Sequence, residues 1–105
     1  MTAGQAPPPG EGPGTLRLDK FLVFARFFRT RARAQALIGG RRVRINSQAV
    51  DKAHALVRPG DVLTFPQGQQ IRVIRILRLP RRRGSAPEAA THYEEVPPAE
   101  AAHAP

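Results

Sequence analysis

The chain has 105 residues and a net charge of +9 at pH 7, with 15 arginines, two lysines and eight acids. No apolar run is long enough to cross a bilayer, and the absence of cysteine excludes disulfides and thiolate metal sites. The N-terminus lacks the basic and apolar regions of a secretory signal, so we expect a cytoplasmic protein. Arginine grips phosphate through a planar fork, so its excess over lysine favours a nucleic-acid partner; a GC-rich genome would produce the same bias.

The two ends of the chain are poor in residues that form a core. Residues 1–14 are almost all proline, glycine and small residues, and residues 96–105 are similar. Such segments bury too little surface to offset the entropy of ordering. We expect disordered tails over 1–14 and 96–105, one domain over 15–79, and a basic loop with a short helix over 80–95.

Apolar residues at helical spacing predict a first helix from about Leu18 to Phe27. Thr30 is a good N-cap for a second helix, Arg31 to Ile38. Gly39 and Gly40 should end that helix, because one of them is free to take a positive φ. The short connection predicts a tight helix pair. The core contacts that we expect are Leu18, Phe21, Leu22, Ala25 and Phe28 from the first helix and Ala34, Leu37 and Ile38 from the second.

Strand patterns follow the second helix. Residues 42–45 alternate, with Val43 and Ile45 inward and Arg42 and Arg44 outward, and a turn at Asn46–Ser47 leads to a strand at residues 49–50. Turns at residues 58–61 and 66–68 frame strands over 62–65 and 70–77. Apolar residues on both sides of Val73 predict a bulge there or burial of both faces.

Helix, helix and then three or four short strands predict a small α+β domain. After the sheet, the residues Pro80 to Gly84 form a basic loop. Ser85 or Pro87 should open a short helix that runs through Glu95. The basic charge is concentrated earlier, because residues 16–45 hold nine of the Lys/Arg residues and a single acid, Asp19. A folded, amphipathic unit with this charge is typical of a surface that binds a polyanion.

The residues 17–20 (RLDK), 29–31 (RTR) and 38–46 (IGGRRVRIN) resemble the alpha-L RNA-binding motif, the domain named after the fourth protein of the small ribosomal subunit. The match spans about Leu16 to Phe65. A narrower resemblance, which includes residues 81–95, is to the bacterial ribosome-associated heat-shock protein fifteen family. Its members act on large ribosomal subunits that still hold a nascent chain on tRNA. The chain departs from that family in three ways: phenylalanine stands at positions 21 and 24, which often hold tryptophan, serine follows Asn46, and a short, acidic end rich in proline and alanine stands where the family typically has a basic extension.

Duplex RNA is recognised by its shape and backbone, so its binding surface needs well-spaced cations rather than a base code. The start of the second helix offers backbone amides to a phosphate, and the helices and first strand supply the cations. Arg31 and Gln35 should share one helical face, and Asp19 should be structural, capping a helix or pairing with a nearby arginine. The predicted RNA-binding residues are Arg17, Lys20, Thr30, Arg31, Arg33, Gln35, Arg41, Arg42 and Arg44.

Three features stay open at this stage. Arg26 and Arg29 either contact RNA or serve the first helix, Arg26 by solvating it or by pairing with a carboxylate. The phenylalanines of the first helix are core residues, of which one is a candidate stacking platform. Residues 81–83 are either a charged linker or an RNA contact.

The histidines, serines and acids form no catalytic or metal-like cluster in the sequence, so we expect neither an enzyme nor a cofactor. We expect a monomer whose partners are structured RNA, namely large-subunit ribosomal RNA and tRNA. The first alternative is a module that binds another structured RNA, and the second, ranked lower, is a DNA-binding regulator. Binding to anionic membranes ranks lowest, because the core already uses the apolar stripe of the first helix.

Overall fold

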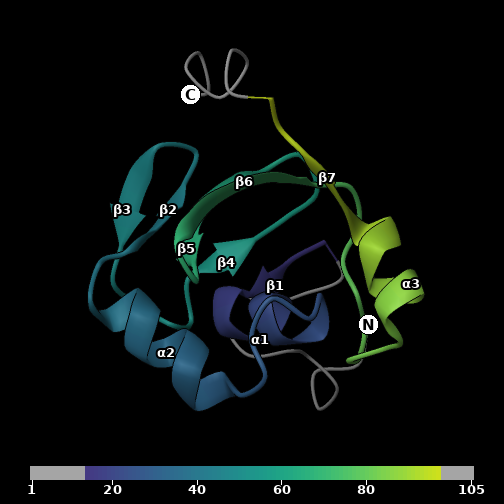
Figure 1. The fold of residues 1–105 in the computed structure, drawn as a ribbon, viewed down its shortest axis with the longest axis horizontal. Coiled ribbons are helices and arrows are strands. Elements are labelled where there is room, and N and C mark those ends of the chain that lie inside the picture. Colours follow the sequence, from purple (N-terminus) through teal and green to yellow (C-terminus); the bar gives the residue numbers. More distant parts are fainter. Residues whose placement is uncertain (1–13, 98–105) are drawn as a thin grey trace, which may run out of the picture.

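The computed structural model describes residues 14–97, so both predicted tails fall almost wholly outside the described residues (Figure 1). The fold is α+β, as predicted. Within the described part, no helix is long and apolar enough to span a membrane. In chain order, the elements are β1 (Leu16–Arg17), α1 (Leu18–Phe24), α2 (Arg31–Gly39), β2 (Val43–Ile45), β3 (Gln48–Val50), β4 (Leu56–Val57), β5 (Val62–Gln67), β6 (Gln70–Ile76), α3 (Ala86–Ala89), η2 (Ala90–His92) and β7 (Tyr93–Glu95).

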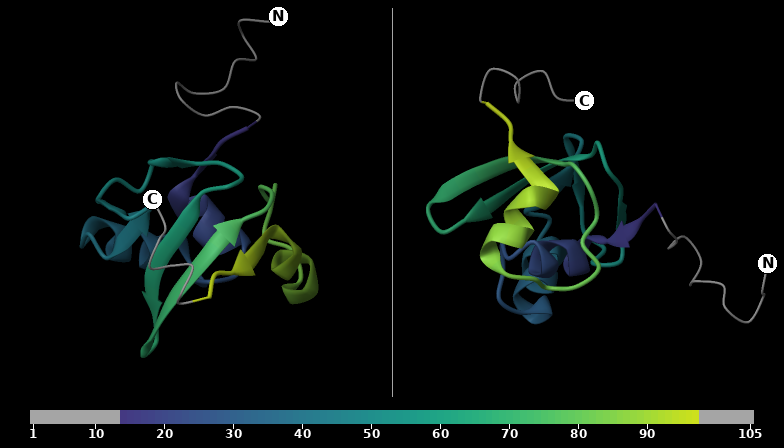
Figure 2. Two further views of the ribbon diagram at one scale, coloured as in Figure 1. Left: turned by 90° about the horizontal axis from the view of Figure 1, so that it is seen from above. Right: turned by 90° about the vertical axis from the view of Figure 1, so that its right-hand side faces the viewer.

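The main sheet is antiparallel and has the strand order β3-β2-β5-β6-β7, while β1 and β4 pair separately. The expectation of three or four strands was therefore too low. The sheet arches over α1, with α2 below the β2–β3 end and α3 near the β7 end (Figures 1 and 2). Apolar residues of α1, α2, β2, β5 and β6 fill the space between the helices and the sheet.

Helix α1 ends at Phe24, three residues before the predicted end. Arg26 takes a left-handed φ of 68° and reverses the chain. The Phe27 N–H donates to the Leu22 carbonyl and the Arg26 N–H to the Val23 carbonyl, each at 3.0 Å. This is the hydrogen-bond pattern of a Schellman cap, with arginine where glycine is usual. The reversal returns Phe27 to the core.

Phe27 then forms the centre of an aromatic cluster. Its ring lies 5.0 Å from that of Phe65 on β5 and 4.6 Å from that of Tyr93 on β7. Phe21 of α1 lies 6.4 Å away. Phe21 and Phe27 are buried, whereas Phe24 and Phe28 are half-buried. Apart from Phe24, discussed below, the phenylalanines of this region are core residues, as predicted.

Helix α2 begins as predicted, with the Thr30 hydroxyl accepting the Arg33 N–H at 3.2 Å. Its end differs from the prediction. Gly40 has an ordinary φ of −81°, and the left-handed residue is Arg41, with a φ of 60°. The Arg42 N–H donates to the Leu37 carbonyl at 3.2 Å, which completes a second Schellman cap. Neither glycine therefore supplies the positive φ that we expected.

Strands β2 and β3 form a hairpin whose two-residue turn is Asn46–Ser47, as predicted. Both residues have positive φ, 51° and 73°, which is the backbone of a type I′ turn. The Asn46 side chain fixes the hairpin to β5. Its amide donates to Asp61 at 3.0 Å, and its oxygen accepts the Val62 N–H at 2.9 Å.

Strands β5 and β6 pair without interruption from Val62↔Arg75 to Gln67↔Gln70, so the bulge expected near Val73 is absent. Strand β5 runs two residues beyond its predicted end, and the turn falls at residues 68–69. Ile74 and Ile76 face the core. The opposite face is not buried at the end of the hairpin, since Ile71 is 66% exposed.

The C-terminal segment is only half helical. Ser85 caps α3, accepting the Glu88 N–H at 3.3 Å, as one of the two predicted helix starts requires. The helix continues for one 3₁₀ turn and stops at His92, because residues 93–95 form β7 instead and pair with β6. The prediction of a helix through Glu95 was therefore wrong for its last three residues. The following residue, Val96, is buried, and its N–H donates to the Val73 carbonyl at 2.9 Å.

Candidate nucleic-acid interface

The buried carboxylate of Asp19 organises the first part of the site. Asp19 lies in the first turn of α1 and is 0% exposed. Its Oδ1 accepts the Lys20 backbone N–H at 2.8 Å. The Arg17 guanidinium, which comes from β1, binds both carboxylate oxygens, with Nε 3.2 Å from Oδ1 and Nη2 3.1 Å from Oδ2. Arg17 is therefore held side-on, in the bidentate geometry that fixes a guanidinium most firmly.

The same carboxylate reaches across to α2. Arg31 Nη2 lies 3.1 Å from Oδ2, and Gln35 Nε2 lies 2.9 Å from it. Residues four apart share one face of a helix, so this contact confirms that Arg31 and Gln35 lie together. It also confirms that Asp19 pairs with nearby arginines. One side chain thus ties β1, α1 and α2 to each other and fixes two arginines relative to the helices.

Two opposing effects act on the pKa of Asp19. Burial raises it, and the hydrogen bonds from Gln35, Arg31 and Arg17 lower it; the donors prevail, so the pKa lies below that of an ordinary aspartate. Asp19 is therefore ionised at neutral pH. Arg17 and Arg31 keep 31% and 44% of their side-chain surface exposed, so both still reach solvent. The cluster of two arginines and one aspartate carries a net positive charge that a polyanion can approach.

The first turn of α2 adds Thr30 and Arg33. The Thr30 side chain is occupied by the cap, and the cap leaves the amides of the first turn at an exposed end of the helix. Arg33 is exposed, and no acid among residues 14–97 pairs with it. A phosphate near this turn could therefore pair with the Arg33 guanidinium without first breaking an ion pair to an acid of the described chain.

The C-terminal end of α2 and strand β2 carry three more arginines. Arg41 lies 3.6 Å from Asp51, but both side chains are largely exposed, and such pairs contribute only about 0–1 kcal/mol. Arg42 is exposed and has no acidic partner in the described part of the chain. Arg44 donates to the Ser47 carbonyl at 3.4 Å, within its own hairpin. All three side chains can therefore turn to a phosphate at little cost.

The structure thus divides the predicted site residues into groups. Arg17, Arg31 and Gln35 converge on Asp19, while Arg41, Arg42 and Arg44 lie at the other end of α2, roughly 14 Å away for a helix of this length. Arg17 stands on β1 rather than on the first helix. We refer to the nine predicted residues together as the α2 surface; they are Arg17, Lys20, Thr30, Arg31, Arg33, Gln35, Arg41, Arg42 and Arg44.

Other arginines have different roles. Arg26 donates to the Gly84 carbonyl at 2.8 Å, so it fastens the C-terminal segment to the end of α1 rather than pairing with a carboxylate. Arg72 pairs with Glu95, donates to Gln67 at 2.6 Å and lies 5.3 Å from the centre of the Phe27 ring. Its pKa is raised further, chiefly by the hydrogen bond to Glu95. Arg75 lies 2.8 Å from Glu94. The two β7 glutamates thus neutralise two arginines of the sheet.

Within residues 14–97, no group of three histidine, cysteine or acidic side chains is arranged to hold a metal ion. The arginines of this site, two of which are held in place by the buried Asp19 carboxylate, suit the binding of a large anion. What this arrangement offers chemically is a set of positive charges around two helices and two strands, of which those of Arg17 and Arg31 are held in place by Asp19.

Comparison with known proteins agrees with this geometry. Residues 16–63 match the S4 domain, and this range contains the whole α2 surface. The heat shock protein 15 homolog of Aeromonas salmonicida is 40% identical over 90 residues, which cover 86% of this chain and 67% of that protein. Heat shock protein 15 of Escherichia coli K12 is 40% identical over 81 residues, 77% of this chain and 60% of that one. The solved structure of Vibrio cholerae heat shock protein 15, described as trimeric, superposes with a TM-score of 0.76 at 33% identity and covers 86% of this chain and 89% of that one.

The chain belongs to the heat shock protein 15 family. Membership in this family, together with the S4 domain, makes the chain an RNA-binding, heat-shock-related protein. The resemblance that the sequence indicated, to the alpha-L motif and to this family, is therefore confirmed. Members of the heat shock protein 15 family are RNA-binding proteins and not known enzymes.

Sequence reasoning found the cations but not how they are arranged. It placed Asp19 near an arginine, yet gave no sign that one carboxylate would hold residues 17, 31 and 35 together. It also missed a cleft beside α1 that includes Lys20 and Arg81. The only sequence signal for that cleft was the run of arginines at residues 81–83, whose role stayed open.

Proposed function

We propose that the α2 surface binds structured ribosomal RNA on the large ribosomal subunit. The observation that carries the proposal is the Asp19 cluster, which holds Arg17 and Arg31 at about 3.1 Å from one buried carboxylate while leaving both exposed. Arg33 and Arg42 add cations without an acidic partner in the described chain. Arg17 and Arg31 are already held in position before binding, so they lose little conformational entropy when RNA binds. This arrangement therefore favours a rigid partner with regularly spaced phosphates.

A folded RNA supplies such phosphates. RNA helices are recognised mostly by shape and by contacts to phosphate and 2′-hydroxyl groups, because side chains cannot read their deep, narrow groove. The cations of the α2 surface lie in two groups, one near the start of α2 and one after its end, roughly 14 Å apart, and the second group continues onto β2. Two groups at this spacing suit a backbone with repeated phosphates better than they suit a single small anion.

The proposal has a finer part, which rests on the family. The preferred subunit is one that still carries a nascent chain on tRNA, so the protein serves ribosome rescue. A described domain of about 80 residues would act by occupying or shifting a bound tRNA rather than by cutting it. The chain spans 60–67% of the length of the curated relatives given above, so functions of their remaining segments are not transferred to it.

Sedimentation with purified ribosomal subunits tests the proposal. The tagged full chain is mixed with empty small subunits, empty large subunits and large subunits loaded with peptidyl-tRNA. We expect co-sedimentation with the large subunit, stronger when it is loaded. The test variant is Arg33→Glu with Arg42→Glu, because neither side chain pairs with an acid in the described structure, and it should lose binding.

The matched control is Lys52→Glu with Arg58→Glu, which changes the net charge equally at exposed residues outside the α2 surface. It should bind nearly as the parent does. Equal loss in both double variants would show that total charge, not the α2 surface, governs binding. Preference for the small subunit or for free tRNA would replace the ribosomal proposal with the broader one, a module for another structured RNA.

Two further measurements separate the alternatives. Affinity for structured RNA, duplex DNA and anionic vesicles at one salt concentration distinguishes an RNA-binding protein from a DNA regulator or a membrane-surface protein. We propose that the chain acts as a monomer, whereas the Vibrio cholerae relative is described as trimeric. Light scattering of the free chain decides between these states.

A further inference from the structure

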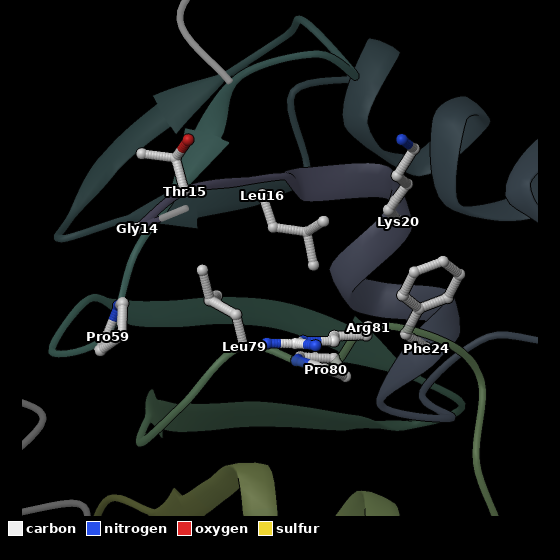
Figure 3. A pocket seen from close by; sticks show the side chains of 9 residues that line it. All are labelled: Gly14, Thr15, Leu16, Lys20, Phe24, Pro59, Leu79, Pro80 and Arg81. Carbon is white, nitrogen blue, oxygen red and sulfur yellow. The ribbon is translucent and has the colours of Figure 1, made fainter. Parts of the chain in front are cut away.

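A cleft of about 530 Å³ lies between β1, α1 and the segment after β6 (Figure 3). Leu16 of β1 and Leu79 of the segment after β6 project toward each other from its two walls, and Phe24 stands at the α1 end. All three side chains are half-buried, so part of each remains accessible. The cleft is thus a slot of mixed polarity, with two leucines facing each other across it and an aromatic ring at one end.

Two cations border this slot. Lys20 lies one turn before Phe24 on α1, and Arg81 comes from the basic loop on the opposite wall. Among residues 14–97, no acidic residue lines the cleft. The apolar side chains, with Arg81 in the slot and Lys20 at its rim with its amine directed toward α2, fit a ligand that has a flat apolar part and an anionic group.

The cleft adjoins the α2 surface directly. Successive residues of a strand point to opposite sides, so Leu16 enters the cleft while its neighbour Arg17 reaches Asp19. Lys20 belongs to both regions. A chain of phosphates bound along the α2 surface would therefore pass the mouth of the cleft.

We propose that this cleft takes one unpaired nucleotide of the bound RNA. Its base lies between Leu16 and Leu79 beside the Phe24 ring, and its flanking phosphates contact Lys20 and Arg81. Unpaired bases are commonly held by stacking on aromatic side chains, and the volume lies within the range of roughly 300–1,000 Å³ found for small-ligand sites. The inference rests on the proposed RNA binding and adds a preference for RNA with a bulged or splayed-out base.

The inference assigns different roles to the arginines of the basic loop. Arg81 lines the cleft, whereas Arg83, two residues later, is exposed and does not line it. Within the described residues, neither has an acidic partner, since the one ion pair of the loop joins Arg82 to Glu88 at 3.6 Å. Arg81 and Arg83 therefore form a matched pair of charge sites for mutation.

Fluorescence anisotropy with three labelled RNAs tests the inference on the full chain. The first RNA is a fully paired duplex, the second carries one bulged adenosine, and the third carries an abasic residue at the bulge. We expect the parent protein to bind the adenosine bulge about fivefold or more tightly than either of the others. Arg81→Gln should reduce this preference, and Arg83→Gln should keep it while weakening all three complexes alike.

The outcomes are distinguishable from failure of the proposed function. No binding to any of the three RNAs contradicts RNA binding itself. Equal binding of the paired and bulged RNAs overturns the cleft inference and leaves the proposed function standing. Equal binding of the abasic and adenosine bulges also overturns it, because the protein would then respond to the bend and not to the base. The comparison among RNAs uses the unaltered protein, so it does not depend on whether a variant folds.

Discussion

At the scale of single residues, the side chain with the largest consequences is one that is inaccessible to RNA. Asp19 is fully buried, and its oxygens accept hydrogen bonds from Arg17, Arg31 and Gln35. A buried carboxylate with several donors is stable only as a set, because removal of one member leaves the others unsatisfied. The position of two arginines that we propose to bind RNA therefore depends on a residue that does not reach solvent.

Asp19→Ala should lower the free energy of unfolding by roughly 3 kcal/mol, the low end for a broken buried pair, since both arginines still reach water. RNA binding should weaken as well, because the released guanidinium groups become mobile. Denaturant unfolding and RNA titration measure the two effects. Asp51→Ala, which removes the exposed partner of Arg41, is the control and should change stability by less than about 0.5 kcal/mol. Equal stability of the two variants would contradict the role given to Asp19.

The lowered pKa of Asp19 predicts how stability depends on pH. Between the folded pKa and the ordinary aspartate value of about 3.9, the unfolded chain binds more protons than the folded chain. The stabilisation is therefore complete above that ordinary value and is lost as the pH falls toward the folded pKa. Unfolding curves between about pH 2 and 7 should show this loss in the parent and a smaller one in Asp19→Asn. Parallel pH profiles for both proteins would count against it.

At the scale of elements, α1 and α2 are each followed, two residues after their last helical residue, by an arginine in the left-handed region, Arg26 and Arg41. Glycine is the usual residue at this position of a Schellman cap, and a side chain there strains the backbone. An arginine at position 26 has a structural explanation, because its guanidinium donates a hydrogen bond to the Gly84 carbonyl. Arg41 has only the exposed pair with Asp51, so its side chain is better explained by the ligand that we propose for the α2 surface.

Arg41→Gly should therefore raise the free energy of unfolding, by up to about 1 kcal/mol, because it relieves the left-handed strain. It should at the same time weaken RNA binding by removing one cation. Thermal unfolding and RNA titration of the same preparation measure both. Arg41→Ala is the control, since it removes the charge and keeps the strain. If Arg41→Gly proves no more stable than Arg41→Ala, backbone strain at this residue is negligible.

The elements that the sequence predicted well are those with local signals. Thr30 caps α2, and Ala34 and Ile38 are buried at helical spacing. Strands β1 and β4 have two residues each and exist only because Leu16 and Val57 pair across 40 residues of chain, so no local pattern reveals them. Strand β7 likewise depends on its partner β6.

The same distinction applies to the site. Its cations could be chosen from charge and spacing, because exposed arginines need no particular neighbour. The Asp19 cluster joins three elements, and the cleft has walls that are about 60 residues apart in sequence, Leu16 and Leu79. Such arrangements follow from tertiary packing, which hydrophobic periodicity does not encode. The early end of α1 escaped prediction for a related reason, since Arg26 occupies a conformation that its residue type disfavours.

At the scale of the whole molecule, positive charge is distributed unevenly. Residues 16–45 hold nine of the 17 basic residues, while the sheet arginines at positions 72 and 75 are paired with β7. Each basic side chain that binds a phosphate releases condensed counterions. The strength of binding should therefore depend steeply on salt.

With four to six phosphates neutralised, the logarithm of the association constant should fall with a slope of roughly 0.7–0.9 per contact against the logarithm of salt concentration. Between about 50 and 200 mM salt, binding should weaken on the order of a hundredfold. RNA titrations across this range measure the slope, and Arg42→Ala should reduce it by about one contact. A tenfold change or less would exclude the basic surface as the main binding site.

The glutamates of β7 have a consequence for kinetics. Because they neutralise Arg72 and Arg75 on the sheet, while residues 16–45 keep an excess of positive charge, we expect the molecule to carry an electric dipole and not merely a net charge. In the field of a polyanion, such a molecule turns during its approach, so that α2 arrives first. A larger share of collisions is then productive, and association is faster than random orientation would allow. We therefore expect the last described strand, β7, which is remote from the α2 surface in sequence, to help set the direction from which this protein meets its target.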